Sequence, residues 1–148
     1  LRMIACQAVI DPDRRVRGLI CTVVELVMGR LERTYRLDDP GVLDVARRWA
    51  EALAAEGWVS ALNLQGRRDR SGTFRVFELN GRFTGGSSAR TQLGFDEVGL
   101  LIEAFTGQAL PPHPPAGRAD IVTKSLSDFP MSSADIEKLQ AEGLWQRA

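Results

Sequence analysis

The sequence predicts an α+β fold, a mainly antiparallel β-sheet flanked by helices that we expect to pack on one side. Short apolar, β-branched runs come in pairs around polar turn signals, which is typical of β-hairpins. Segments between these pairs carry apolar residues at three- and four-residue spacing, which indicates amphipathic helices. Paired strands of this kind favour an antiparallel sheet over a doubly wound parallel one.

Length and composition point to one ordinary domain over residues 1–148, with enough chain to bury a core. Apolar residues make up 44% and charged residues 26%, so disorder is not expected. Lys+Arg and Asp+Glu both number 19, and this balance argues against a nucleic-acid or anionic-membrane binder. The apolar stretches are far shorter than the ~20 residues of a membrane span. We therefore expect neither nucleic acid nor membrane as a partner.

The start of the chain and its two cysteines indicate whether the chain is part of a longer polypeptide and in which compartment it resides. The chain opens with Leu1 and has neither an initiator Met nor a secretory signal, which predicts a piece of a longer polypeptide. Cys6 and Cys21 have no metal-type spacing and fit a reducing compartment, so we expect a cytoplasmic protein. They could face each other across a tight hairpin. Two buried thiols are favoured over a cross-strand disulfide.

The first element is a hairpin over residues 1–28. Met3 to Ile10 and Val16 to Met28 are apolar and rich in strand formers, and the polar turn Asp11-Pro12-Asp13 separates them. The mixed, charged segment 29–37 is expected to be a loop, with strand character only near its end.

A helix is predicted over residues 39–57. Asp39 is a good N-cap, and Pro40 suits the first turn because its missing N–H costs nothing there. Gly57 has the usual role of a helix-ending glycine. The apolar face consists of Val42, Val45, Ala46, Trp49, Ala50 and Leu53.

A second hairpin is predicted over residues 58–80. Its strands run from Trp58 to Gly66 and from Thr73 to Asn80, with a charged turn between them. Trp58 begins a strand and Trp49 lies on the apolar helix face, so we expect both in the core.

The last third of the chain predicts a helix over residues 96–106, followed by a strand and a helix over residues 119–143. Ser132 offers a capping-box-like start for the final helix. The proline-rich segment 110–115 reads as a stiff connector. It contains His113, the single histidine, so His-based zinc sites and His-dependent triads are nearly excluded.

The residues that carry chemistry lie on the second hairpin. Glu78, Asn80 and Arg82 alternate with apolar residues and therefore share one face of a strand. Asn63 and Gln65 alternate in the same way on the preceding strand. If the hairpin closes at its Ser-Gly dipeptide, Gln65 faces Glu78 and Asn63 faces Asn80. The pattern thus predicts a two-by-two group of carboxylate and amide oxygens.

Such a group suits a hard cation such as Mg²⁺, which takes one or two protein carboxylates together with phosphate oxygens and water. Arg82 adds a planar, permanently charged donor for phosphate or carboxylate. The Gly/Ser-rich segment 81–88 offers backbone N–H groups to oxyanions. These are the parts that phosphoryl transfer needs. The competing interpretation is the ordinary solvated face of an antiparallel sheet, and the pattern leaves both open.

A family resemblance is carried by Gln65 and, after the hairpin turn, by residues 77–88, which read FELNGRFTGGSS. This order resembles the metal and phosphate end of the ATP-grasp fold, in its carbamoyl phosphate synthetase large-chain-like branch. The Gly-Phe-Asp-Glu sequence at residues 94–97 matches the start of the next helix in that branch. The similarity extends over most of the chain and is densest from Trp58 to Gly107.

The resemblance implies a role for each matched residue. Glu78 would bridge Mg²⁺ (or Mn²⁺) ions, Asn80 would ligate one of them, and Gln65 would add a metal or phosphate contact. Arg82 would hold the transferred phosphoryl group or the acyl phosphate, and Arg90 would assist it. ATP and the divalent metal are the implied cofactors.

The implied activity is an ATP- and Mg²⁺-dependent carboxylate–amine or carboxylate–thiol ligase that works through an acyl phosphate. Its substrates would be a small-molecule carboxylate and an amine. The chain resembles only the second subdomain of the ATP-grasp clamp, because its two lysines, Lys124 and Lys138, come late and no phosphate-covering loop is recognisable. The N-terminal part of the same polypeptide is therefore the expected partner, and the chain alone is expected to be inactive.

The sequence departs from the family at three positions. Gly81 stands where many relatives have Pro, and acidic residues are missing near Met3 and Gln7. Two other classes of function stay open: a non-catalytic nucleotide-binding or regulatory module, and a plain α+β interaction domain. An apolar face left uncovered by an absent subdomain also predicts homodimerisation.

Overall fold

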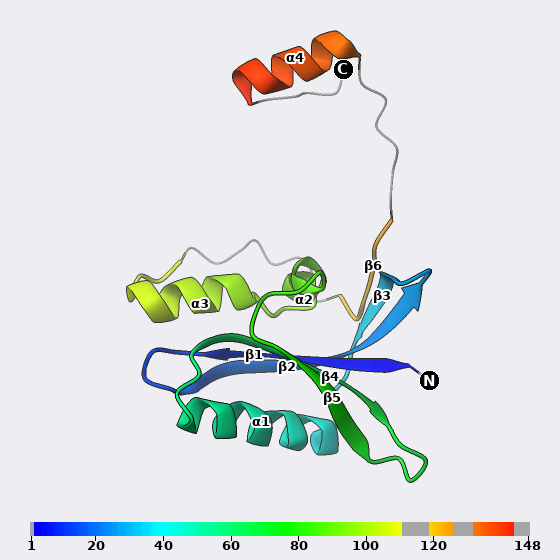
Figure 1. Cartoon of the computed structure of the whole chain (residues 1–148), viewed down its shortest axis with the longest axis vertical. Coiled ribbons are helices and arrows are strands. Elements are labelled where there is room, and N and C mark those ends of the chain that lie inside the picture. Colours follow the sequence, from blue (N-terminus) through cyan, green and yellow to red (C-terminus); the bar gives the residue numbers. More distant parts are fainter. Residues whose placement is uncertain (1, 111–118, 126–131, 144–148) are drawn as a thin grey trace.

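The structure, a computed structural model, describes residues 2–110, 119–125 and 132–143. The proline-rich segment from residue 111 onward, with His113, lies outside the described residues. Six strands form one antiparallel sheet in the order β5-β4-β1-β2-β3-β6 (Figure 1). This confirms the predicted α+β class. Among the described helices, none is both long and apolar enough to cross a membrane.

The elements follow the chain in the order strand, strand, strand, helix, strand, strand, helix, helix, strand, helix. Their bounds are β1 (Met3–Ile10), β2 (Val16–Val27), β3 (Arg30–Arg36), α1 (Pro40–Ala55), β4 (Ser60–Arg68), β5 (Phe74–Asn80), α2 (Ser87–Gln92), α3 (Glu97–Thr106), β6 (Ile121–Thr123) and α4 (Ser133–Glu142).

Helices cover both faces of the sheet, so the expectation that they pack on one side was wrong. α1 lies against one face, and α2 and α3 lie against the other (Figure 1). The reason lies in β1, where seven of the eight residues are buried. Cys6 and Ala8 belong to the core under α1, while Gln7 and Val9 point to the opposite face. A strand buried on both sides needs a covering layer on each.

The N-cap predicted for the first helix is confirmed, but the predicted burial of its tryptophan is not. The Oδ1 of Asp39 accepts a hydrogen bond from the backbone N–H of Val42 at 3.0 Å. The buried residues of α1 are Val42 and three alanines, whose small side chains let the helix approach the sheet closely. Trp49 lies at the margin and is 41% exposed, and Trp58 is 37% exposed. Both were expected in the core.

The segment expected as a loop, residues 29–37, forms strand β3 instead. Arg30 and Arg33 of β3 are exposed, and Arg33 pairs with Glu25 of β2 at 3.6 Å. Thr34 faces inward and is buried. Helix α2 was not predicted, because six residues are too few to show helical periodicity.

The two cysteines face each other as the sequence allowed. Cys6 pairs with Cys21 in the β1–β2 register, and both are buried free thiols. A hydrogen bond with Cys21, and then burial, raise the pKa of the Cys6 thiol far above its usual range. The prediction of two buried thiols is confirmed.

The β4–β5 hairpin has the predicted pairing at its functional end. Gln65 faces Glu78, and Asn63 faces Asn80. The turn closes differently, with the backbone N–H of residue 69 bonded to the carbonyl of residue 73. A β-bulge between Gln65 and Gly66 then adds one residue to β5 and restores the pairing. The correct register therefore results from two compensating shifts.

Gly66 is expected to be required at this bulge. A Cβ there would lie 2.4 Å from the backbone oxygen of Arg75 and 2.4 Å from the ring of Phe74. Gly66→Ala should lower the free energy of unfolding by about 1–3 kcal/mol, the usual cost of overpacking. Gly85→Ala is the matched control, because nothing lies within 4 Å of its added Cβ. Urea unfolding of both variants measures the difference, and equal midpoints would contradict the prediction.

Candidate functional site

The sheet face that carries α2 and α3 also carries the polar residues. Because the strands pair in register, their side chains form rows across this face. One row begins at the edge strand β5 with a carboxylate and extends over five of the six strands, as far as β3. Its members are Glu78, Gln65, Ala5, Thr22 and Arg36.

The predicted carboxylate and amide group is assembled on this face. The Nε2 of Gln65 donates to the Oδ1 of Asn63 at 3.1 Å, and the Nδ2 of Asn80 donates to the Oε1 of Glu78 at 2.8 Å. Glu78 is exposed on the edge strand, whereas Asn63 is fully buried. Solvent exposure thus falls across the four side chains, from the exposed carboxylate of Glu78 to the buried amide of Asn63.

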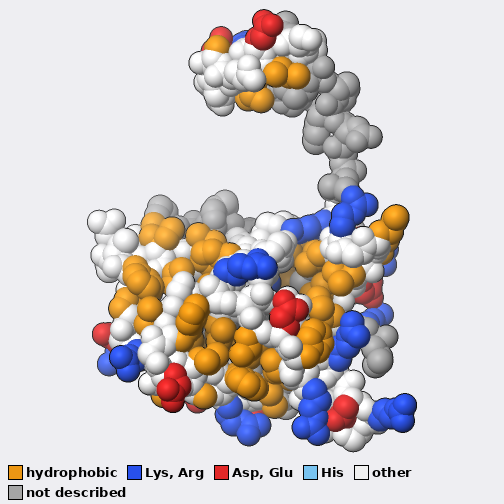
Figure 2. Space-filling view, viewed as in Figure 1, with side chains coloured by type: hydrophobic (Ala, Val, Ile, Leu, Met, Phe, Trp, Pro, Cys, Tyr) orange, Lys and Arg blue, Asp and Glu red, His pale blue; other side chains and the backbone are white. Residues whose placement is uncertain are grey.

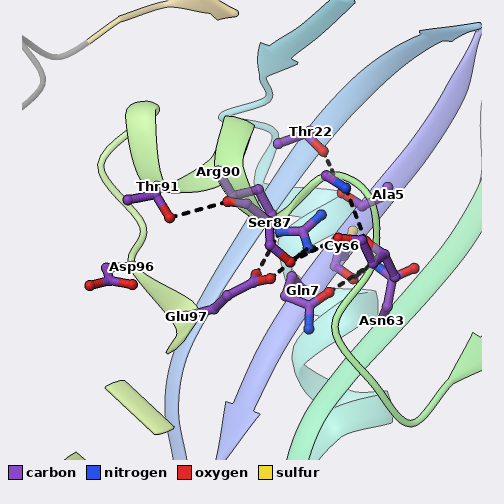
Figure 3. A network of polar contacts seen from close by, with 12 residues as sticks. Ala5, Cys6, Gln7, Thr22, Asn63, Ser87, Arg90, Thr91, Asp96 and Glu97 are labelled. Carbon is purple, nitrogen blue, oxygen red and sulfur yellow. Dashed lines mark hydrogen bonds and ion pairs between the residues drawn. The ribbon is translucent and has the colours of Figure 1, made fainter. Parts of the chain in front are cut away.

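Gln7 extends the group by one strand and is the residue that the sequence analysis missed as a site member. It is fully buried, and its Oε1 accepts a hydrogen bond from the Nδ2 of Asn63 at 3.0 Å (Figure 3). Its Nε2 has no hydrogen-bond partner among the described residues. A polar side chain inside the apolar run of β1 was the available signal. Its membership depends on β1 lying beside β4, which no local pattern reveals.

Arg82 follows the end of β5 and is exposed. Its Nη1 donates to the backbone carbonyl of Phe83 at 3.1 Å. Arg82 comes two residues after Asn80, and its exposed guanidinium is a permanently charged donor that suits anions. Its role toward phosphate stays a prediction.

Arg90 is buried in an ion pair. Its Nε donates to Glu97 Oε2 at 2.6 Å, and its Nη2 donates to Glu97 Oε1 at 2.7 Å. Figure 3 shows the two side chains pointing toward each other. The Nη2 also donates to Thr84 Oγ1 at 3.1 Å and to Ser87 Oγ at 3.3 Å. Arg90 therefore ties the loop after Arg82 to the start of α3, which makes it a positioning residue.

Gly86 allows this arrangement of the loop and Arg90. A Cβ on Gly86 would lie 2.5 Å from the Nη1 of Arg90, so a side chain there would push against the guanidinium. Lys124, just after β6, donates its Nζ to the carbonyl of Gly85. The structure thus brings this lysine to the loop.

A cavity of about 180 Å³ lies between the loop and the sheet. Asn63 and Gln65 line it from the sheet, and residues 84–86 with Arg90 line it from above. It therefore opens beside the amide end of the polar group.

The donor set suits one kind of metal. No three His, Cys, Asp or Glu side chains gather closely enough to hold a metal ion in the part of the chain that the structure describes. One carboxylate, Glu78, and the amide oxygens of Asn80 and Gln65 share one face. This set fits Mg²⁺, or the similar Mn²⁺, when phosphate oxygens and water complete the coordination. It does not fit zinc, which prefers nitrogen and sulfur ligands.

No protein-family model and no curated protein sequence matches the chain. Solved structures do match. N5-carboxyaminoimidazole synthetase from Staphylococcus aureus, complexed with ADP, has a TM-score of 0.60 at 12% identity, over 74% of this chain and 31% of that one. The biotin carboxylase domain of Hydrogenobacter thermophilus 2-oxoglutarate carboxylase, in complex with MgADP, ADP and bicarbonate, has a TM-score of 0.56 at 18% identity, over 74% and 25%.

Biotin carboxylase from Campylobacter jejuni, in a nucleotide complex, matches with a TM-score of 0.56 at 19% identity, over 82% of this chain and 28% of that one. The chain is therefore similar in fold to part of each of these enzymes. This agrees with the fold that the resemblance to ATP-grasp proteins implied. The chain spans about 25–31% of the length of these three chains.

Proposed function

We propose that this chain supplies the metal- and phosphate-binding half of an ATP-grasp ligase. The observation that supports this most is the in-register group of Glu78, Asn80 and Gln65 on one sheet face, with Arg82 following. The fold around it is that of part of ATP-grasp enzymes, and two of the three structures compared hold ADP or MgADP. A solvated sheet face would not require the buried amides of Gln7 and Asn63 behind the carboxylate.

In this proposal each residue acts by position and charge. Glu78, with the oxygens of Asn80 and Gln65, would hold Mg²⁺ or Mn²⁺, which neutralises charge on the nucleotide phosphates when it is bound. Arg82 would bind oxygens of the γ-phosphoryl group. A substrate carboxylate oxygen attacks the γ-phosphorus, ADP leaves, and an acyl phosphate forms. An amine or thiol then attacks the acyl carbon and expels phosphate.

Arg90 contributes indirectly in this scheme. Its ion pair with Glu97 holds the loop at residues 84–87 over the sheet, beside the site. The loop would thereby keep water away from the acyl phosphate. The free thiols Cys6 and Cys21 suit a cytoplasmic location, where thiols stay reduced.

The N-terminal part of the same polypeptide is the proposed partner. Figure 2 shows hydrophobic side chains gathered on the surface that carries α1 and β5. Exposed apolar residues there include Trp49, Trp58, Phe77, which is 57% exposed, and Leu79. A homodimer is the second way to cover this surface, and light scattering distinguishes the two.

Thermal unfolding with Mg²⁺ and ATP tests the proposal. A polypeptide that carries the N-terminal part should be stabilised by about 2.7 kcal/mol when ATP is at 100 times its Kd, and EDTA should remove the effect. The unfolding temperature of the 148-residue chain alone should change little with Mg²⁺ and ATP, because the other ATP-binding subdomain is not part of it. A strong shift in the chain alone would contradict the need for the other half, and no shift in either would contradict nucleotide binding.

A further inference from the structure

Trp58 lies directly against the end of β5, at the glycine between two of the proposed site residues. A Cβ on Gly81 would lie 2.3 Å from the Cη2 and 2.5 Å from the Cζ2 of Trp58. The six-membered ring of the indole therefore occupies the space that a side chain of residue 81 would need, and only glycine allows this close approach. Gly81, where many relatives have Pro, is thus matched to the indole.

The ring meets the strand end on the side away from the polar group. Glu78 and Asn80 share the polar face, where the Nδ2 of Asn80 donates to the Oε1 of Glu78 at 2.8 Å. Because side chains alternate along a strand, position 81 is directed to the other face, and there it meets Trp58. The indole therefore contacts the strand end from behind and leaves the polar face open.

The position of Trp58 is fixed by the end of α1. Gly57 has a φ of 101°, a conformation that favours glycine, and it turns the chain out of the helix. The backbone N–H of Trp58 donates to the carbonyl of Leu53 at 2.9 Å. Strand β4 begins two residues later, at Ser60. The indole is thus anchored to α1 and β4, and these elements are separate from the loop that it contacts.

Asn80 and Arg82 flank Gly81 and depend on its backbone for their positions. Among the described residues, Arg82 has no carboxylate partner, and its Nη1 donates to the backbone carbonyl of Phe83 at 3.1 Å. No ion pair therefore holds this guanidinium in place. A displacement of about 1 Å can cost about 100-fold in rate where groups must be aligned. The contact behind Gly81 thus bears directly on the proposed site.

Resting on the proposed function, we propose that Trp58 is a positioning residue for the nucleotide. Its indole, packed against Gly81, fixes the backbone from which Asn80 reaches the metal and Arg82 reaches the γ-phosphoryl group. A smaller ring at residue 58 leaves a gap behind this turn, and a larger residue 81 pushes the turn toward the polar face. Either change misplaces both ligands, whereas the two changes together compensate each other.

A double-variant cycle tests this pairing in the polypeptide that carries the N-terminal part. Gly81→Ala adds a methyl group that collides with the indole, and Trp58→Phe removes the ring atoms that it would meet. Calorimetric titration measures the Kd of MgADP and of the Mg²⁺ complex of β,γ-methylene-ATP, whose γ-phosphoryl group is not transferred. Phe105→Leu is the control, because it removes ring atoms at a position of α3 that is 53% exposed. It should change neither Kd.

We expect Gly81→Ala to weaken binding of MgADP about threefold and binding of the ATP analogue about tenfold, because ADP lacks the group that Arg82 holds. Trp58→Phe should act in the same order with smaller changes. The double variant should return both Kd values to within about twofold of the parent, since the methyl group fills the gap behind the turn. A merely structural role would weaken both nucleotides equally. A defect in docking of the N-terminal part would not be repaired by a methyl group at residue 81.

Unchanged Kd values in Gly81→Ala, or losses that add up in the double variant, would overturn the inference and leave the proposed function standing. A parent that binds neither nucleotide would instead reject the proposed function. NMR of the 148-residue chain then decides whether the indole positions the turn. The backbone amide signals of Asn80 and Arg82 should move in Gly81→Ala and return in the double variant. Signals that stay in place would overturn the inference.

Discussion

Glu78→Gln is expected to lower the rate of Mg²⁺-dependent ATP turnover at least about 100-fold in the polypeptide that carries this chain. Glu78 is the only carboxylate in the polar group of the sheet face, as far as the described residues show. Glutamine keeps the size and one oxygen but removes the negative charge that a divalent cation requires. The other donors, Asn80 and Gln65, are neutral and cannot compensate.

The measurement is phosphate release at saturating ATP over a range of Mg²⁺ concentrations. Glu56→Gln is the matched control, because it removes an exposed carboxylate at the end of α1 and should leave turnover unchanged. Turnover in Glu78→Gln at the level of the control would reject the role proposed for Glu78. Binding of MgADP without turnover in the parent protein would favour a binding module without catalysis. A plain interaction domain would show no turnover in any form of the protein.

The second large effect is on stability. Glu97→Gln should lower the free energy of unfolding by about 3–5 kcal/mol, because it leaves the buried charge of Arg90 without its partner. The two side chains are 3% and 0% exposed, so water cannot replace the lost oxygen. The free energy of unfolding of small domains is about 5–15 kcal/mol, so this loss is a large part of the total stability. Urea unfolding measures it.

Two further variants make this test specific. Glu51→Gln on α1 removes a carboxylate that is 57% exposed and should cost less than about 1 kcal/mol. The double variant Arg90→Leu/Glu97→Leu should recover much of the stability, because no buried charge is left unpaired. It should still bind MgADP weakly, because the loop at Thr84 and Ser87 has lost its anchor. A Glu97→Gln protein as stable as the parent would contradict the prediction.

Much of the local structure was predictable from short-range patterns. Alternation along residues 60–68 and 74–80 identified the hairpin and placed Glu78 and Asn80 on one face. The N-cap at Asp39 identified the start of α1. Such features depend on neighbours within a few residues, and the sequence contains those neighbours directly.

Long-range features were not predictable in the same way. The segment 29–37 resembles a loop, and it becomes a strand because β2 and β6 pair with it on either side. Trp49 lies on the apolar helix face, yet the alanines on that face make the close contact and leave it at the margin. Arg90 looked available for phosphate until its pairing with Glu97 was visible.

The sequence by itself determined the hairpins, the main helices and the set of residue types at the site, because period-two alternation, turn signals and caps act locally. Only the tertiary structure decided how these parts meet. It placed β1 between β4 and β2, which added Gln7 to the polar group and buried the strand on both faces. It also folded the loop over Ala5 and Thr22 and so formed the cavity. These outcomes depend on packing between residues far apart in the chain, which no local pattern encodes.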